Sequence, residues 1–488
     1  MFNVKTTKKK TLNKADGSAY SLDTEYELVM RTASLLFGES KYYKNEQSEY
    51  DAVLQKAIKD NPEFVLKLAA YTRNELFIRS TPLYMLVECA NLRTGSVDSA
   101  YKYVSRIVRR ADELSEIVAL QFSRNKINNI NKHVMPKMLK KGLSKAFTGF
   151  NEYQFAKYNR VKEVKLRDVM FLVHPKPVTP SQANVFAMIA SDSLPVPETW
   201  ETVMSNWSKK FDTKKEAWEY VMPKMGILAQ LRNLRNFVAE NCDIKAVLDT
   251  FTDENIKKSM IFPFRFYIAR KILEDLPVYA SPKIQVLVEM LDNAMKVSTK
   301  YVGKLPGNTL ILVDGSGSMS SSLSKDSTVQ CSDIANFFGG VSPLMCEYSD
   351  VIVFAEKFKK IFVSKDVMTN VGNISNAHVG YATYPHLPLN KVREDKAFYD
   401  RIIMFSDMQC YSQGIGNEFA SSLTMYKRDI NPNCKLYSID LVGYGTAQVL
   451  PSKDVALIGG WSDKILKFIS VFERDRSTML DEIKNYKV

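Results

Sequence analysis

Apolar residues recur at helical spacing almost without interruption from about residue 22 to residue 299. Between 51 and 76 one apolar stripe is broken by Asn61-Pro62 and then resumes, and an Asn-Pro pair followed by an acidic residue predicts a helix start. The same reasoning predicts a helix over 83–92, after Thr81-Pro82, and a helix or close helix pair over 221–240. Many helices with short breaks favour an all-α solenoid of HEAT-like pairs, with a compact all-α bundle as the alternative.

The pattern changes after Gly307. Residues 309–313 form a continuous apolar run, which is expected of a parallel strand covered on both faces. Similar runs follow at 351–354, 402–405 and 436–441, with helical stretches at 329–338 and 417–426 between them. This alternation predicts a doubly wound α/β domain. The sequence therefore divides into a helical domain, 1–308, and an α/β domain, 309–488.

The positive charge of the chain lies in the helical part. The 488 residues carry a formal net charge of +13. Residues 309–488 contain 19 Lys and Arg against 20 Asp and Glu, a net charge of −1, so the other 308 residues carry 48 against 34, a net charge of +14. Such asymmetry favours a negatively charged partner, with nucleic acid the leading candidate and an inert basic surface the alternative.

Other features exclude several classes of protein. No run of about 18 uncharged apolar residues occurs, so we expect no membrane span. The first ten residues lack the apolar core of a signal peptide. Six scattered cysteines without a Cys-x-x-Cys pair argue against a zinc cluster and a disulfide framework, and favour a reducing cytoplasm.

The segment Asp314-Gly315-Ser316-Gly317-Ser318 directly follows the strand predicted at 309–313. Ligands of open α/β sheets bind at the carboxyl ends of strands, so these side chains are expected at such an edge. One carboxylate and two hydroxyls, spaced two residues apart, can converge on one hard cation. The alternatives are a helix N-cap in a polar turn and phosphate binding, although the loop lacks the Gly-Lys-Ser/Thr ending of a P-loop.

Asp-x-Ser-x-Ser after a buried strand resembles the metal-ion-dependent adhesion site of von Willebrand factor A domains. The resemblance implies a Thr from a second loop, here Thr383, and an Asp after a later strand, here Asp407. It also implies a divalent cation, most simply Mg²⁺, with Mn²⁺ and Ca²⁺ as alternatives. Tyr384-Pro385 stands where an acidic neighbour would strengthen the match. No general base, nucleophile or second metal accompanies the site, so we expect docking rather than catalysis, and no enzyme.

Four segments of the helical part carry a second resemblance, and they occur in order: 61–64 continuing through Ala-Tyr-Thr-Arg-Asn-Glu at 70–75, Leu-Arg-Asp at 166–168 leading to His-Pro-Lys-Pro at 174–177, Leu-Arg-Asn-Leu-Arg-Asn at 231–236, and Pro-Phe-Arg-Phe at 263–266. Followed by a von Willebrand A domain, they resemble the TROVE module of the Ro RNA-binding proteins, bacterial relatives included. The resemblance implies a HEAT-like ring that binds Y-like small non-coding RNA on a basic outer surface and single-stranded ends of misfolded RNA through the hole. It also implies a role in RNA quality control or processing, an exoribonuclease partner and a monomer.

The predicted RNA-contacting residues concentrate within a short basic stretch. In the family pattern, Lys157, Arg160 and His174 fall at positions associated with RNA contact. Side chains that neutralise phosphate or stack on an unpaired base add further candidates, namely Tyr158, Lys162, Lys165 and Arg167. A solvated helix face would explain these lysines and arginines equally well, and His174 before Pro175 would also serve as a structural cap.

Four arginines in the resembling segments remain open between two roles: Arg73, Arg232, Arg235 and Arg265. They contact RNA, or they hold helical layers together by pairing with Glu75 or with backbone carbonyls. For the whole chain, the alternative to RNA binding is a metal-dependent protein-interaction adaptor. A metal-dependent nuclease is disfavoured because no clustered acidic multi-metal site is present.

Overall fold

The computed structural model describes residues 10–12, 18–20, 24–34, 46–76, 78–92, 100–124, 135–159, 163–277, 281–322, 329–407, 418–441, 454–459, 469–470, 473 and 476–487. Contacts divide the chain into two compact units. The first comprises residues 1–36, 45–197 and 472–488, and the second comprises 37–44 and 198–471. The predicted division at 308/309 lies close to the start of the sheet at Leu305. Each compact unit, however, contains residues from both sides of that division. Closure into a ring concerns the placement of these units and stays a prediction.

The first unit is an array of helices in which neighbours along the chain pack together, as predicted for HEAT-like pairs. Its elements are β1 (Lys10–Leu12), β2 (Ser18–Tyr20), α1 (Thr24–Ser34), α2 (Glu46–Asp60), α3 (Pro62–Asn74), α4 (Ser80–Leu92), α5 (Ala100–Ile107), α6 (Ala111–Arg124), α7 (Lys137–Phe147), α8 (Glu152–Tyr158), α9 (Leu166–Val173), α10 (Pro180–Ala190) and α23 (Arg476–Lys484).

The helix start predicted at Asn61-Pro62 is confirmed, whereas the helix predicted over 83–92 begins earlier, at Ser80. Asn61 is the N-cap of α3, and its side chain accepts a hydrogen bond from the Phe64 N–H at 3.1 Å. Pro62 occupies the first position of α3, where a missing N–H has no cost. Pro180 begins α10 in the same way. Capping residues and prolines therefore mark the starts of α3 and α10.

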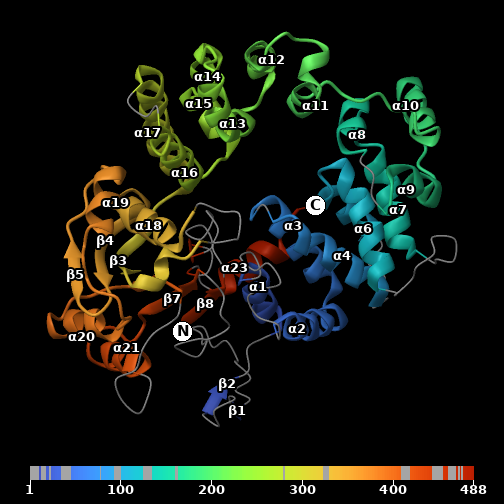
Figure 1. Ribbon diagram of the computed structural model, residues 1–488. Helices are drawn as coiled ribbons and strands as arrows, with labels where there is room; N and C mark the ends of the chain where they lie inside the picture. The colour runs from blue at the N-terminus through green and yellow to red at the C-terminus, as the bar shows by residue number, and fades with distance from the viewer. Residues whose placement is uncertain are drawn as a thin grey trace. The chain divides into compact units, whose positions relative to one another are not determined.

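Within the first unit, the last helix that the structure describes packs against two of the first helices. Helix α23 packs against α1 and α3 (Figure 1). The ammonium group of Lys484 lies 2.7 Å from Glu25 Oε2, and Lys67 Nζ donates to the Lys484 carbonyl at 2.6 Å. The last helix is thus a structural part of the helical array rather than of the sheet.

The second unit combines helices with a six-stranded sheet. Its helices are α11 (Trp200–Ser205), η2 (Trp207–Lys209), α12 (Lys214–Val221), η3 (Met222–Lys224), α13 (Ile227–Ala239), α14 (Lys245–Thr250), α15 (Asp253–Ser259), α16 (Pro263–Glu274), α17 (Pro282–Val302), η4 (Gly317–Ser320), α18 (Cys331–Met345), α19 (Val367–Ser375), α20 (His386–Glu394) and α21 (Glu418–Asp429). Its strands are β3 (Leu305–Asp314), β4 (Cys346–Phe354), β5 (Phe358–Ile361), β6 (Arg401–Ser406), β7 (Lys435–Asp440) and β8 (Val455–Gly459).

The sheet has the order β5-β4-β3-β6-β7-β8, and only β5 is antiparallel to its neighbour. Helices α18 and α19 lie on one side of it, and α20 and α21 on the other (Figure 1). This confirms the predicted doubly wound α/β domain, and the order of strands from β3 onward fits a von Willebrand A-like fold. The direction of strand order reverses at β3, which is where such sheets bind ligands.

Aromatic side chains join helix α16 to this sheet domain. The ring of Phe264 lies 5.2 Å from that of Phe337, and Phe338 stacks on Phe405 at 5.0 Å. Beside them, Lys271 forms an ion pair with Asp333. The helical segment before β3 is therefore packed on α18 by apolar contacts and one charge pair.

Among the described residues, no helix is long and apolar enough to cross a membrane. Among these described residues, five cysteines are buried and form no disulfide: Cys89, Cys242, Cys331, Cys346 and Cys434.

Replacing Gly340 by alanine is expected to destabilise the second unit. A Cβ atom there would lie 2.8 Å from Val371 Cγ2 and 3.1 Å from the Val367 carbonyl, so α18 and α19 would have to separate. We expect a loss of about 1–3 kcal/mol, measured by urea unfolding. Gly372→Ala, on α19 with open space around the new Cβ, is the matched control and should be neutral or stabilising by up to about 1 kcal/mol. Equal effects of the two substitutions would contradict this packing.

Candidate metal site and nucleic-acid interface

Asp314 is the last residue of β3, at the centre of the sheet. Strand β3 pairs with β4 on one side and β6 on the other, so the ends of β3 and β6 are neighbours. The Asp314 side chain is buried, with 1% of its surface exposed. Its position is therefore the ligand-binding edge that the sequence predicts.

The Asp314 carboxylate is held by two neutral donors. Ser406 Oγ donates to Oδ2 at 2.6 Å, and the Ser316 N–H donates to Oδ1 at 2.9 Å. The hydroxyls of Ser316 and Ser318 lie 3.2 Å apart. Asp407, which follows Ser406, is fully buried. Two strand ends thus bring together two carboxylates and two hydroxyls.

The loop that contains Thr383 lies against the loop that follows β3. The Gly317 N–H donates to the Tyr381 carbonyl at 3.2 Å, and the Tyr384 N–H donates to the Ala355 carbonyl at 3.2 Å. Thr383, between them, is 1% exposed. At Gly315 a Cβ would come within 2.9 Å of both Val353 and Val379, so only glycine permits this approach.

Burial makes this end of the sheet unfavourable for negative charge. It raises the pKa of Asp314 to about 6, an effect that the hydrogen bonds from Ser406 and Ser316 oppose and the nearby charge of Asp407 increases. Burial also raises the pKa of the Cys331 thiol, at the start of α18, to about 12, and the charges of Asp407 and Asp440 add to that shift. A cation at this edge would offset the charge of these carboxylates.

The donor set fits a hard divalent cation rather than zinc. Within the described part of the chain, no group of three or more His, Cys, Asp or Glu side chains is arranged to hold a metal ion. An ion at Asp314 would therefore depend on the hydroxyls of Ser316, Ser318 and Thr383 as well as on the two carboxylates. Oxygen ligands of this kind suit Mg²⁺.

Lys157 and Tyr158, at the end of α8, border a cavity of about 230 Å³ in the first unit. The Lys157 ammonium lies 5.9 Å from the ring centres of both Tyr153 and Tyr158, and the Arg110 guanidinium lies 4.6 Å over the Tyr158 ring. Cations and aromatic faces therefore alternate here, an arrangement that suits phosphate and base contacts.

The predicted residues around α9 have different surroundings. Lys165 precedes the helix, and its ammonium is 3.3 Å from Asp192 Oδ2, so a carboxylate already compensates its charge. The Arg167 guanidinium lies 5.5 Å from the Phe171 ring centre. His174 is exposed and ends α9 in a left-handed conformation with φ 48°, so it does serve as the cap. Arg160 and Lys162 lie outside the described residues.

The four arginines for which the sequence leaves two roles open have different surroundings in the structure. Arg73 is structural: its Nε donates to the Ile107 carbonyl at 3.0 Å, and its Nη2 lies 2.6 Å from Glu113 Oε1. Its carboxylate partner is thus Glu113 rather than Glu75. Arg232 and Arg235, on α13, and Arg265, on α16, are exposed.

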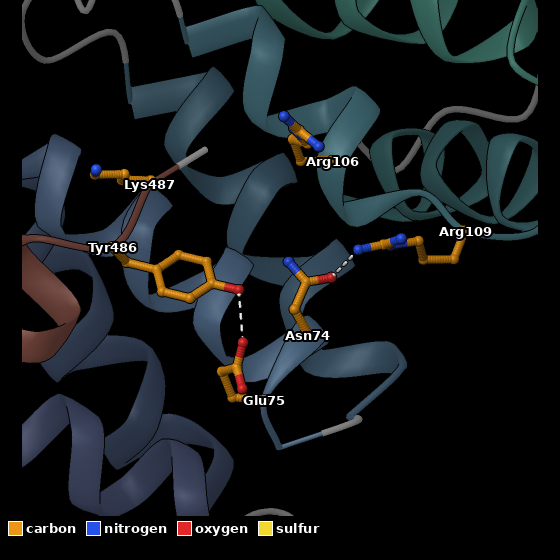
Figure 2. A pocket seen from close by; sticks show the side chains of 6 residues that line it. All are labelled: Asn74, Glu75, Arg106, Arg109, Tyr486 and Lys487. Carbon is orange, nitrogen blue, oxygen red and sulfur yellow. Dashed lines mark hydrogen bonds between the residues drawn. The ribbon is translucent and has the colours of Figure 1, made fainter. Parts of the chain in front are cut away.

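Sequence reasoning missed Arg106, Arg109 and Lys487. These three basic residues line a second cavity of the first unit, of about 360 Å³, together with Asn74, Glu75 and Tyr486 (Figure 2). The residues come from positions near 75, 107 and 487, and no local pattern connects positions so far apart.

Comparison with known proteins identifies the family. The TROVE domain matches residues 27–193 and 191–302, which is more than half of the chain. The chain belongs to the TROVE domain family. The solved structure described as the "Crystal structure of Deinococcus radiodurans RO (RSR) protein" is similar to it with a TM-score of 0.71 and 13% sequence identity, covering 92% of this chain and 99% of that chain. A comparison with curated proteins gave no match.

As a TROVE-family chain that extends beyond the matched residues, the protein combines two kinds of candidate site. The basic and aromatic residues on α8 and α9 lie within the match, and the Asp314 site lies outside it. The similarity to the Deinococcus structure extends over both regions and supports the two-part fold.

Because the pKa of the Asp314 carboxyl is raised, we expect the free energy of unfolding to depend on pH when divalent ions are absent. Its pKa is about 6 in the folded chain, above its ordinary value of 3.8, so the folded state binds the proton more tightly than the unfolded state. Its stabilising contribution is present below pH 4 and is lost as the pH rises to about 6. In EDTA, Asp314→Asn should gain stability relative to the parent by up to about 3 kcal/mol between pH 4 and 7. A stability difference that does not change over this range would contradict the assignment.

Proposed function

We propose that the chain is a Ro-like RNA-binding protein. In this proposal it binds Y-like small non-coding RNA on its basic helices and single-stranded ends of misfolded RNA, and it acts in RNA quality control or processing. The match to the TROVE domain over more than half of the chain carries the proposal, and the similarity to a Ro structure supports it. An exoribonuclease partner, a monomeric state and a cytoplasmic location belong to the same proposal.

The distribution of charge supports RNA over an acidic protein as the ligand. The net charge of +14 lies in residues 1–308, and the TROVE match falls within these residues. At the cavity beside α8, the Lys157 ammonium faces two tyrosine rings. Cations bind phosphates and release counterions, while aromatic faces accept bases without sequence preference.

For the sheet domain we propose a divalent-ion site, with Mg²⁺ as the ion. Asp314, Ser316, Ser318, Thr383 and Asp407 would hold it. The ion would supply positive charge and an open coordination position for a partner's carboxylate. The residues themselves position oxygen atoms at the sheet edge, and no group beside them is assigned to catalysis.

A metal-dependent protein-interaction adaptor is the second candidate function. One observation favours it: Tyr381 is 81% exposed, and its backbone carbonyl accepts a hydrogen bond from Gly317 in the loop of the Asp314 site. An exposed aromatic ring beside an ion site is suited to contact with a protein partner. This role would add to RNA binding, because the two sets of residues lie in different units.

RNA that co-purifies with the chain should dissociate as salt is added. Each phosphate contact contributes to the slope of log affinity against log salt, so Lys157→Gln should reduce that slope by about 1. Filter binding with the co-purified RNA measures it. The control is Lys258→Gln, an exposed lysine paired with Glu254, which should leave the slope unchanged. Retention of no RNA, or affinity independent of salt, would refute RNA binding.

Millimolar Mg²⁺ should raise the melting temperature of the chain, and Asp314→Ala should abolish that increase. The reason is that an ion bound only by the folded state stabilises it. Differential scanning calorimetry with and without EDTA measures the effect. Asp395→Ala, which removes an exposed carboxylate of the same unit, should respond to Mg²⁺ like the parent. RNA affinity should be retained in Asp314→Ala; its loss in a folded variant would refute the separation of the two sites.

A further inference from the structure

The end of the chain completes a cavity that the predicted RNA site does not include. Figure 2 shows Tyr486 and Lys487 approaching the end of α3, with Arg106 and Arg109 on the side of α5. The cavity, of about 360 Å³, is lined by three cationic side chains and one carboxylate. A volume of this size suits a small charged group.

Specific contacts fix the terminal residues in this position. The Tyr486 hydroxyl donates to Glu75 Oε1 at 3.0 Å, and the Tyr486 ring meets that of Tyr71 edge-on at 5.6 Å. Before them, Lys484 pairs with Glu25. Lys487 therefore extends from an anchored backbone at the edge of this cavity.

Two of the three cations of this cavity have no partner among the described residues. Arg106 and Lys487 are exposed, and within the described ranges neither forms a hydrogen bond or an ion pair. Arg109 donates to the neutral amide oxygen of Asn74. With three cations and one carboxylate, Glu75, in its lining, the cavity keeps an excess of positive charge. An anion would complete it.

Arg109 also lines the neighbouring cavity, which has aromatic walls. There, Tyr153 is 51% exposed while Phe150 is 8% exposed, so one ring is free to stack and the other supports the wall. A guanidinium shared between a cationic cavity and an aromatic cavity matches the alternation of phosphate and base in a nucleic-acid strand.

We propose that the two cavities form one subsite for single-stranded RNA, which rests on the proposed RNA-binding function. Arg106, Arg109 and Lys487 contact internucleotide phosphates of the strand, and a base stacks on Tyr153. The C-terminal segment is thereby a part of the RNA-binding surface. An acidic peptide would match the cations but would leave the tyrosine without a stacking partner.

The test is binding of a fluorescent single-stranded oligouridylate, with a 5′-hydroxyl end, to the full chain. Arg106→Gln and Lys487→Gln should each weaken binding about three- to tenfold and reduce the salt slope by about 0.7. Tyr153→Ala should weaken binding about tenfold with no change in the salt slope, and Tyr153→Phe should bind like the parent. Arg106→Lys should keep the salt slope.

Lys258→Gln and Tyr348→Ala are matched controls, since each removes an exposed side chain of the same type elsewhere. Circular dichroism and melting temperature establish that all variants are folded. If the parent binds the oligouridylate and the Arg106 and Lys487 variants bind like the controls, the subsite is refuted while RNA binding stands. If the parent binds no RNA, the proposed function itself fails.

Two further arms identify the source of the phosphate. A 5′-phosphorylated oligouridylate should show the same losses in the variants as the 5′-hydroxyl strand. Losses confined to the phosphorylated strand would assign the cavity to a terminal phosphate and overturn the internucleotide assignment. Oligoglutamate of equal charge should compete poorly; equal competition would assign the cavity to acidic peptides and overturn the proposal.

Discussion

The buried carboxylate of Glu113 is the interaction on which the helical unit depends. None of its side-chain surface is exposed, so its charge must be compensated by the protein. Arg73 and Arg79 supply cations, and the backbone N–H groups of Arg109 and Arg110 donate to Oε2 at 2.8 and 3.2 Å. Removal of one partner of a buried pair costs about 3–5 kcal/mol. The turn between α5 and α6 is thereby fixed, and with it the position from which Arg109 reaches both cavities.

The sheet unit also contains a buried carboxylate, that of Asp314, but its hydrogen-bond donors are of another kind. The donors to the Asp314 carboxylate are a hydroxyl and a backbone N–H, neither of which carries a charge. The consequence is a pKa of about 6, whereas a full ionic partner would hold it low. The Asp314 carboxylate thus lacks a cationic partner of the kind that Arg73 and Arg79 provide at Glu113, and a cation is proposed to bind there.

Local physics explains what the sequence could predict. The strand at 309–313, the turn that follows it and the cap at Asn61 depend on neighbours within a few residues, and all were confirmed. The strands β5 and β8 were missed: β5 has two lysines among its four residues, and β8 is only five residues long. The candidate metal-site residues could be proposed from the sequence because each follows a strand or lies in a glycine-containing loop.

What the sequence could not predict depends on pairs of residues far apart. Arg73 meets Glu113 across 40 positions, Lys165 meets Asp192 across 27, and Lys67 meets the Lys484 carbonyl across 417. No periodicity encodes such pairs, so a paired lysine and an uncompensated one look alike in the sequence. Composition gives the total charge of the helical part and leaves open which cations are already neutralised.

That distinction determines which basic residues affect RNA affinity. A cation that already has a carboxylate partner must give up that partner before it can neutralise a phosphate, so it gains less from RNA binding than an unpaired cation does. Lys165, paired with Asp192, belongs to this class, and Arg73 does so more completely because its partner is buried. Arg106 and Lys487 have no carboxylate partner among the described residues. The salt dependence of RNA binding is therefore expected to depend on a few exposed, unpaired cations rather than on the net charge of +14.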